Sequence, residues 1–108
     1  MSLQESDRAA AAVAVAPRVA LADIEAAIAG TIYATGAEAF GASPHEPLSI
    51  LTLCAVTMKN GFTVIGKSAP ASVMNFNRDL GRKFAYEDAV RQIWPLMGFA
   101  LRDKLHNG

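Results

Sequence analysis

The chain has 108 residues, a length that suits one compact domain and leaves no room for a second core. Apolar residues make up 52% of it, ten basic and ten acidic residues balance, and Cys54 is the only cysteine. These values exclude an internal disulfide and a cysteine-based zinc site, and they argue against disorder. No apolar run reaches the ~18 residues of a membrane span, and no signal peptide is apparent. We therefore expect a cytoplasmic protein with no metal, cofactor or membrane partner.

The charges are unevenly distributed along the chain. Residues 1–50 carry two basic and six acidic residues (net −4), whereas residues 51–108 carry eight basic and four acidic residues (net +4). A basic half on a neutral chain favours a small anionic ligand over duplex nucleic acid, because duplex binders neutralise many phosphates and carry a larger positive excess. The alternative is that these charges form an ordinary solvated surface.

The alanine content and apolar spacing of the first part of the chain favour helix. Residues 1–17 are rich in alanine and predict a flexible leader or a marginal helix ended by Pro17, so the single domain is expected at residues 18–108. From Val19, apolar residues recur near helical spacing and predict a helix that ends around Gly30 or Thr31-Ile32. The Gly- and Pro-containing residues 34–47 predict a loop.

Between residues 48 and 65, two runs of strand-forming residues flank Asn60-Gly61, the strongest signal for a two-residue hairpin turn. A two-residue turn would place Ile65 beside Val56 and Val64 on the opposite face. Both faces would then be largely apolar, and a lone hairpin is marginal in water. We expect helices to cover one face and a second copy of the chain to cover the other, which predicts a homo-oligomer.

A long helix is expected from Val73 to about Trp94, with Ser72 as its N-cap, because Trp94-Pro95 breaks the helical pattern. Gly81 inside this helix predicts a close backbone approach. Two apolar stripes indicate two packing partners for the helix: Phe76, Leu80 and Phe84; and Tyr86, Ala89, Val90 and Ile93. A short C-terminal helix would follow, with one face made of Met97, Leu101 and Leu105.

The predicted fold class is therefore α+β. An antiparallel hairpin or small sheet would pack against the long helix and the short C-terminal helix, with another helix at the N-terminal side. The adjacent carboxylates Glu87 and Asp88 would point about 100° apart on a helix, so they cannot share one substrate proton. Neither a nucleophile–base set nor a phosphate-loop motif is visible, and we expect a binding protein rather than an enzyme.

The candidate ligand-binding residues are Phe62, Asn75, Asn77, Arg78, Arg82 and Arg91. An aromatic ring can stack on a base, and amides at a helix N-terminus can read polar edges. Guanidinium groups pair with phosphate oxygens, and the i, i+4 spacing puts Arg78 and Arg82 on one helix face. The alternatives are a subunit contact for the aromatic ring, capping for the asparagines, and plain solvation for the arginines.

Two segments carry a family resemblance: NGFTVIGKS, and NFNRDLGRKFAYEDAVRQIWPLMGFAL. From about residue 50 to 105, the chain resembles a family of small proteins from tailed bacteriophages and prophages, which is similar to the Thoeris anti-defence protein one. The resemblance implies a homo-oligomeric sponge, a protein that sequesters a cyclic ADP-ribose isomer made by bacterial TIR-domain enzymes. It also implies that relatives hold cyclic oligonucleotides. Val73 departs from the pattern, because the family often has proline there after an acidic cap.

A second function stays open at this point. The hairpin and the C-terminal helix would suit a small phage protein that binds a host or phage protein. Binding of duplex DNA is the third and least favoured class, on charge.

Overall fold

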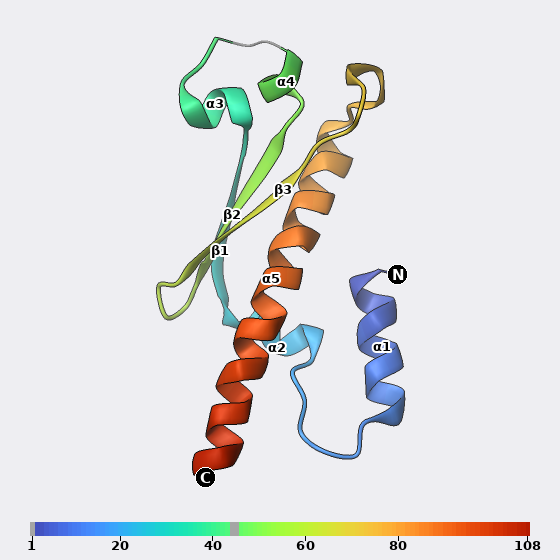
Figure 1. Ribbon diagram of the computed structural model, residues 1–108, viewed down its shortest axis with the longest axis vertical. Coiled ribbons are helices and arrows are strands. Elements are labelled where there is room, and N and C mark those ends of the chain that lie inside the picture. Colours follow the sequence, from blue (N-terminus) through green and yellow to red (C-terminus); the bar gives the residue numbers. More distant parts are fainter. Residues whose placement is uncertain (1, 44–45) are drawn as a thin grey trace.

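The computed structural model describes residues 2–43 and 46–108 and has the α+β architecture that the sequence predicts. The elements in chain order are α1 (Leu3–Val13), α2 (Leu21–Ala27), β1 (Ile28–Thr35), α3 (Gly36–Phe40), α4 (Glu46–Ser49), β2 (Thr52–Met58), β3 (Thr63–Ser68), a 3-10 turn (Val73–Asn75) and α5 (Arg78–Asn107). Figure 1 shows the sheet on one side of α5 and α1 on the other, with the C-terminal part of α5 projecting beyond the strands.

The three strands form one antiparallel sheet in the order β1-β2-β3. The helix predicted from Val19 to about Gly30 is present as α2, but its predicted end is wrong, because α2 ends at Ala27 and the chain continues as β1 from Ile28. β1 pairs with β2 from Ile28 to Thr35, so tertiary pairing decides its conformation over local helix preference. The loop predicted at residues 34–47 contains α3 and the start of α4, while residues 44–45 lie outside the described part.

The β2–β3 hairpin is confirmed, but its register differs by one residue from the prediction. Met58 N donates to Phe62 O at 2.8 Å and Gly61 N donates to Met58 O at 2.9 Å, which closes a three-residue loop. Gly61 takes a φ of +90°, a conformation that favours glycine. As a result Val64 lies opposite Val56 on the buried face, and Ile65 lies on the other face.

Helix α5 begins later and ends later than predicted. Asn77 is its N-cap, accepting a hydrogen bond from Leu80 N at 3.0 Å, whereas Ser72 caps the preceding 3-10 turn. The expected break at Trp94-Pro95 and the separate C-terminal helix are wrong, because α5 continues through Pro95 to Asn107. Trp94 Nε1 donates to Val19 O at 3.0 Å, so contacts outside the helix hold the residue that precedes the proline.

Two glycines let α5 lie close to the sheet. A Cβ at Gly66 in β3 would meet the Ala85 carbonyl oxygen and would lie 2.6 Å from Ala89 N. A Cβ at Gly81 would lie 2.6 Å from Thr52 Oγ1, which confirms the close approach predicted there. The small residues on both sides thus set the distance between helix and sheet.

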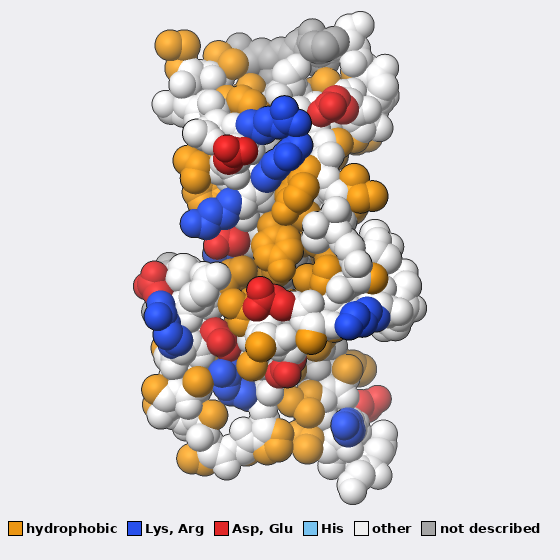
Figure 2. Space-filling view, turned by 180° about the vertical axis from the view of Figure 1, so that it is seen from behind, with side chains coloured by type: hydrophobic (Ala, Val, Ile, Leu, Met, Phe, Trp, Pro, Cys, Tyr) orange, Lys and Arg blue, Asp and Glu red, His pale blue; other side chains and the backbone are white. Residues whose placement is uncertain are grey.

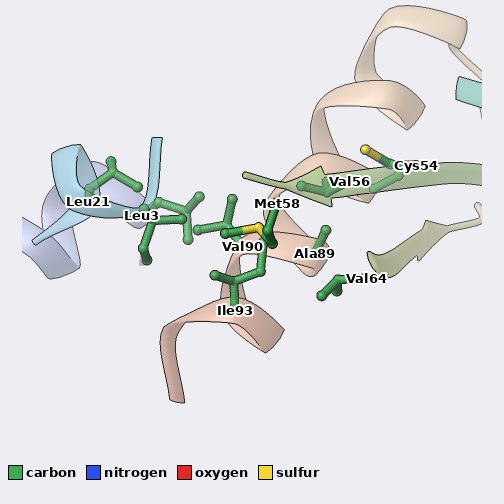
Figure 3. Close-up of a cluster of buried hydrophobic side chains, with 11 residues drawn as sticks. Leu3, Leu21, Cys54, Val56, Met58, Val64, Ala89, Val90 and Ile93 are labelled. Atoms are coloured by element: carbon green, nitrogen blue, oxygen red, sulfur yellow. The ribbon is translucent and has the colours of Figure 1, made fainter. Parts of the chain in front are cut away.

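The core lies between the sheet and α5 and extends to the N-terminal helices. Figure 3 shows Leu21 of α2 and Leu3 of α1 on one side of Val90, with Ile93 and Met58 next to Val90. The further buried members are Ile24, Cys54, Val56, Val64, Ala85 and Ala89. Helix α1 is tied to the following segment by Asp7, whose Oδ1 accepts hydrogen bonds from Arg18 Nη1 at 2.9 Å and from Leu21 N at 3.0 Å.

Candidate functional site

A pocket of about 250 Å³ lies where the N-terminal end of α5 meets the ends of β1 and β2. Its lining combines two cations, one carboxylate, an aromatic ring, two hydroxyls and one small apolar residue: Arg78, Arg82, Glu38, Phe76, Thr35, Thr52 and Ala34. Figure 2 shows basic side chains gathered in the upper part of one face of the molecule, with acidic side chains beside them. A pocket of this composition suits an anionic ligand that also carries polar groups.

Arg78 and Arg82 lie together in this pocket, as their i, i+4 spacing predicts. The Arg82 guanidinium carbon lies 5.3 Å from the centre of the Tyr33 ring, a cation–π distance that orients the side chain. Within the described residues, neither guanidinium forms an ion pair or a hydrogen bond. Both cations are therefore available to an external anion.

Glu38 supplies the one carboxylate of the pocket and is held by a capping box at the start of α3. Its Oε1 accepts a hydrogen bond from Thr35 N at 2.9 Å, and its own N donates to Thr35 Oγ1 at 3.1 Å. The backbone hydrogen bond to Thr35 lowers the pKa of Glu38 below its ordinary value, and the charges of Arg78 and Arg82 lower it further. Glu38 is thus a negative charge facing two positive ones across the same hollow.

The two candidate asparagines lie beside this pocket, not in it. Asn77 is the N-cap of α5 and lies at the helix N-terminus, whereas Asn75 ends the preceding 3-10 turn. Both line a neighbouring hollow of about 100 Å³, and Phe76 contributes to both hollows. Capping, one of the two roles considered for these residues, is what the Asn77 side chain does.

Phe62 lies at the hairpin tip, 56% exposed, and lines an apolar groove with Met58, Leu96 and Ala100. The length of β2, from Thr52 at the pocket to Met58 at the tip, separates this ring from the arginine pair by roughly 20 Å of strand.

Arg91 is also apart from the arginine pair. It follows Arg82 by nine residues, which at 100° per residue puts it on the opposite side of α5, about 14 Å along the axis. One chain therefore does not bring Phe62 or Arg91 to the same small ligand as Arg78 and Arg82.

The sheet face turned away from α5 is a second candidate surface. Ile32 and Ile65 are 72% and 51% exposed there, with Leu53 and Ala55 of β2 between them. The chain has 7,194 Å² of accessible surface, against roughly 5,800 Å² for a compact monomer of its mass. Its radius of gyration is 16.2 Å, against about 13 Å expected for its length.

Several residues of the pocket are not predicted from the sequence. Ala34 and Thr35 belong to the strand that the sequence does not predict, and Glu38 belongs to a segment for which the sequence predicts a loop. The signal that could have found Glu38 is the spacing Thr35-Gly36-Ala37-Glu38, which has the form of a capping box. No local pattern indicates that Glu38 lines the same pocket as the start of α5.

A family model for the Phage protein (N4 Gp49/phage Sf6 gene 66) family matches residues 19–105. The match covers the sheet, the pocket and nearly all of α5, and it begins after α1. Comparisons with curated proteins and with solved structures gave no match. Within residues 2–43 and 46–108, none of the helices is long and apolar enough to cross a membrane.

Proposed function

The chain belongs to this phage protein family, and from that premise we propose that it is a counter-defence protein that sequesters a cyclic nucleotide immune signal. The proposed ligand is a cyclic ADP-ribose isomer, with cyclic oligonucleotides as the related class, and it is held without being hydrolysed. The ligand is named on the resemblance of the sequence motifs to a family similar to the Thoeris anti-defence protein one.

The observation that carries the proposal is the pair of arginines in the pocket at the start of α5, neither of which has an ion-pair partner among residues 2–43 and 46–108. Guanidinium groups bind phosphate oxygens through two parallel hydrogen bonds, so Arg78 and Arg82 suit a pyrophosphate. Phe76 adds an aromatic wall on which a base can stack. Sequestering such a molecule requires that the protein be abundant and bind it tightly. The residues that line the pocket supply the groups for binding.

A homo-oligomer is part of this proposal. The pocket of about 250 Å³ is at the small end for a ligand with two riboses, a base and a pyrophosphate. In the assembly we propose, Phe62 and Arg91 reach the ligand from a second copy, because within one chain they lie far from the arginine pair. The uncovered apolar face and the excess surface supply what an interface burying roughly 800 Å² per partner needs.

Calorimetry with cyclic ADP-ribose isomers tests the proposal. We expect saturable heat with the wild-type chain and a loss of affinity of about 10- to 100-fold in Arg82→Ala, because a hydrogen-bonded charge is removed. Arg102→Ala is the matched control, since Arg102 is exposed on the projecting part of α5 and lines none of the pockets described above. Mass spectrometry of the ligand released by denaturation should return it intact. Absence of heat with these isomers, or recovery of a hydrolysed product, would contradict the proposal.

The second candidate function, binding of a host or phage protein, is favoured by the groove at the hairpin tip. The groove is about 470 Å³ and mainly apolar, and Phe99 and Leu105 are exposed farther along α5. A stoichiometric protein partner that is lost in Phe62→Ala, together with no ligand heat, would support this function over the first.

A further inference from the structure

We propose that Glu38 is a specificity-determining residue of the pocket, whose carboxylate accepts hydrogen bonds from sugar hydroxyls while Arg78 and Arg82 hold the phosphate of the same ligand. The chemical class recognised is then a ribose phosphate, in which an anion and a vicinal diol lie a short distance apart. This inference rests on the proposed function, because it names the chemical group that the same pocket recognises.

The position of the Glu38 carboxylate is set by the backbone around it. Its Oε1 accepts from Thr35 N at 2.9 Å, and hydrogen bonding with the Thr35 side chain also lowers the pKa of the carboxyl. The corner that carries it is tightly packed, since a Cβ at the buried Gly36 would lie 2.9 Å from Leu51 Cδ2. The carboxylate is therefore held in place at the pocket, and its two oxygens, which offer about four lone-pair sites, keep the capacity to accept from a ligand.

The charges of the pocket face each other without pairing. Glu38 is near enough to Arg78 and Arg82 for their charges to lower its pKa, yet these three side chains form no ion pair among the described residues. A ligand with only anionic groups would be attracted by the arginines and repelled by Glu38. A ligand with a phosphate at one end and hydroxyl donors at the other satisfies both sides, and hydrogen bonds to a carboxylate are stronger than those to a neutral acceptor.

The test compares ribose 5-phosphate with 2-deoxyribose 5-phosphate on the full chain, using NMR shifts of the Thr35, Glu38 and Arg82 amides. We expect the wild-type chain to bind the ribose compound about tenfold more tightly, the low end for a hydrogen bond to a charged group. Glu38→Gln should bind the two sugars alike, because it lacks the charged carboxylate that accepts from the hydroxyl. The variant should keep α3 intact, because glutamine also serves in a capping box.

Asp23→Asn is the matched control. Asp23 Oδ2 accepts from Ala20 N at 2.8 Å in the same capping role at α2, outside the pocket, so this variant should keep the tenfold preference. Thermal unfolding of both variants verifies that they fold.

Equal binding of the two sugars by the wild-type chain overturns the inference, as does a preference that survives in Glu38→Gln or an absence of shifts with either sugar. The proposed function fails separately. If ribose 5-phosphate behaves as expected and the cyclic ADP-ribose isomers give no heat, the pocket reads a ribose phosphate and the proposed signal is wrong. If the isomers bind wild type and Glu38→Gln equally, only the role of Glu38 is overturned.

Discussion

The two faces of the sheet have similar apolar chemistry and different surroundings. On the covered face, Cys54 and Val56 are fully buried under α5, whereas Ile32 and Ile65 on the open face are more than half exposed. The covered face is distinguished by Gly66, which lets the helix backbone approach. The comparison teaches that apolar side chains alone do not tell which face has a partner within the chain. A glycine that meets alanines on the facing helix indicates more specifically that a sheet face is covered by a helix of the same chain.

The largest effect should come from a change that separates the covered face from its helix. Gly66→Ala would drive a methyl group into the backbone of α5, so we expect the free energy of unfolding to fall by about 3 kcal/mol. Gly30→Ala is the control on the open face, where a Cβ meets nothing within 4 Å, and should change stability by less than ~0.5 kcal/mol. Urea titrations measure both, and equal losses in the two variants would abolish the distinction between the faces.

A charge on the open face should act on assembly rather than on folding. Ile65→Lys would place an ammonium group in the proposed interface, and we expect self-association to weaken by roughly a hundredfold, about 2.7 kcal/mol. The unfolding of the single chain should be unaffected, because the side chain is already half exposed.

Sedimentation over a range of concentrations measures this effect. Val13→Lys on the exposed side of α1 provides the control, with unchanged association. A wild-type chain that stays monomeric throughout would count against the second copy altogether.

The smallest effect should come from raising the pH, which acts on the covered side. Burial raises the pKa of the Cys54 thiol and of the Tyr86 phenol above their ordinary values of 9.0 and 10.0. The unfolded chain loses these protons first, so this part of the stability is complete below pH 9.0 and declines as the pH rises through and beyond these values.

Urea midpoints recorded across that range should show the decline, and Tyr86→Phe should show a shallower one above pH 10.0. The same slope in wild type and Tyr86→Phe would mean that Tyr86 makes no contribution.

Much of the fold could be predicted because its strongest signals are local. Asn60-Gly61 indicates the hairpin, and the apolar stripe that includes Val90 and Ile93 indicates a helix packed on it. Strand β1 could not be predicted, because its conformation depends on pairing with β2, which lies some twenty residues later in the chain. The continuation of α5 through Pro95 likewise depends on contacts that lie outside the local sequence.

The candidate site also has a part that the sequence predicts and a part that depends on the tertiary fold. Arg78 and Arg82 could be paired by spacing alone, since both stand on one helix. Glu38 and Tyr33 join them only through the path of β1 and α3, so no sequence pattern connects them with the arginines. Whether Phe62 and Arg91 belong to the site depends on a second copy and stays a prediction.

The three-residue loop at the hairpin tip limits how this chain can change over time. Val64 and Ile65 occupy their faces because Lys59, Asn60 and Gly61 are three residues and not two. A shift of one residue in the β2–β3 pairing would exchange the inward and outward sides of the whole of β3, and would move Gly66 away from the helix backbone that needs it, so a change of loop length has to be absorbed within the loop. A solvent-exposed tip is in this molecule constrained by the packing of a glycine farther along the strand that follows it.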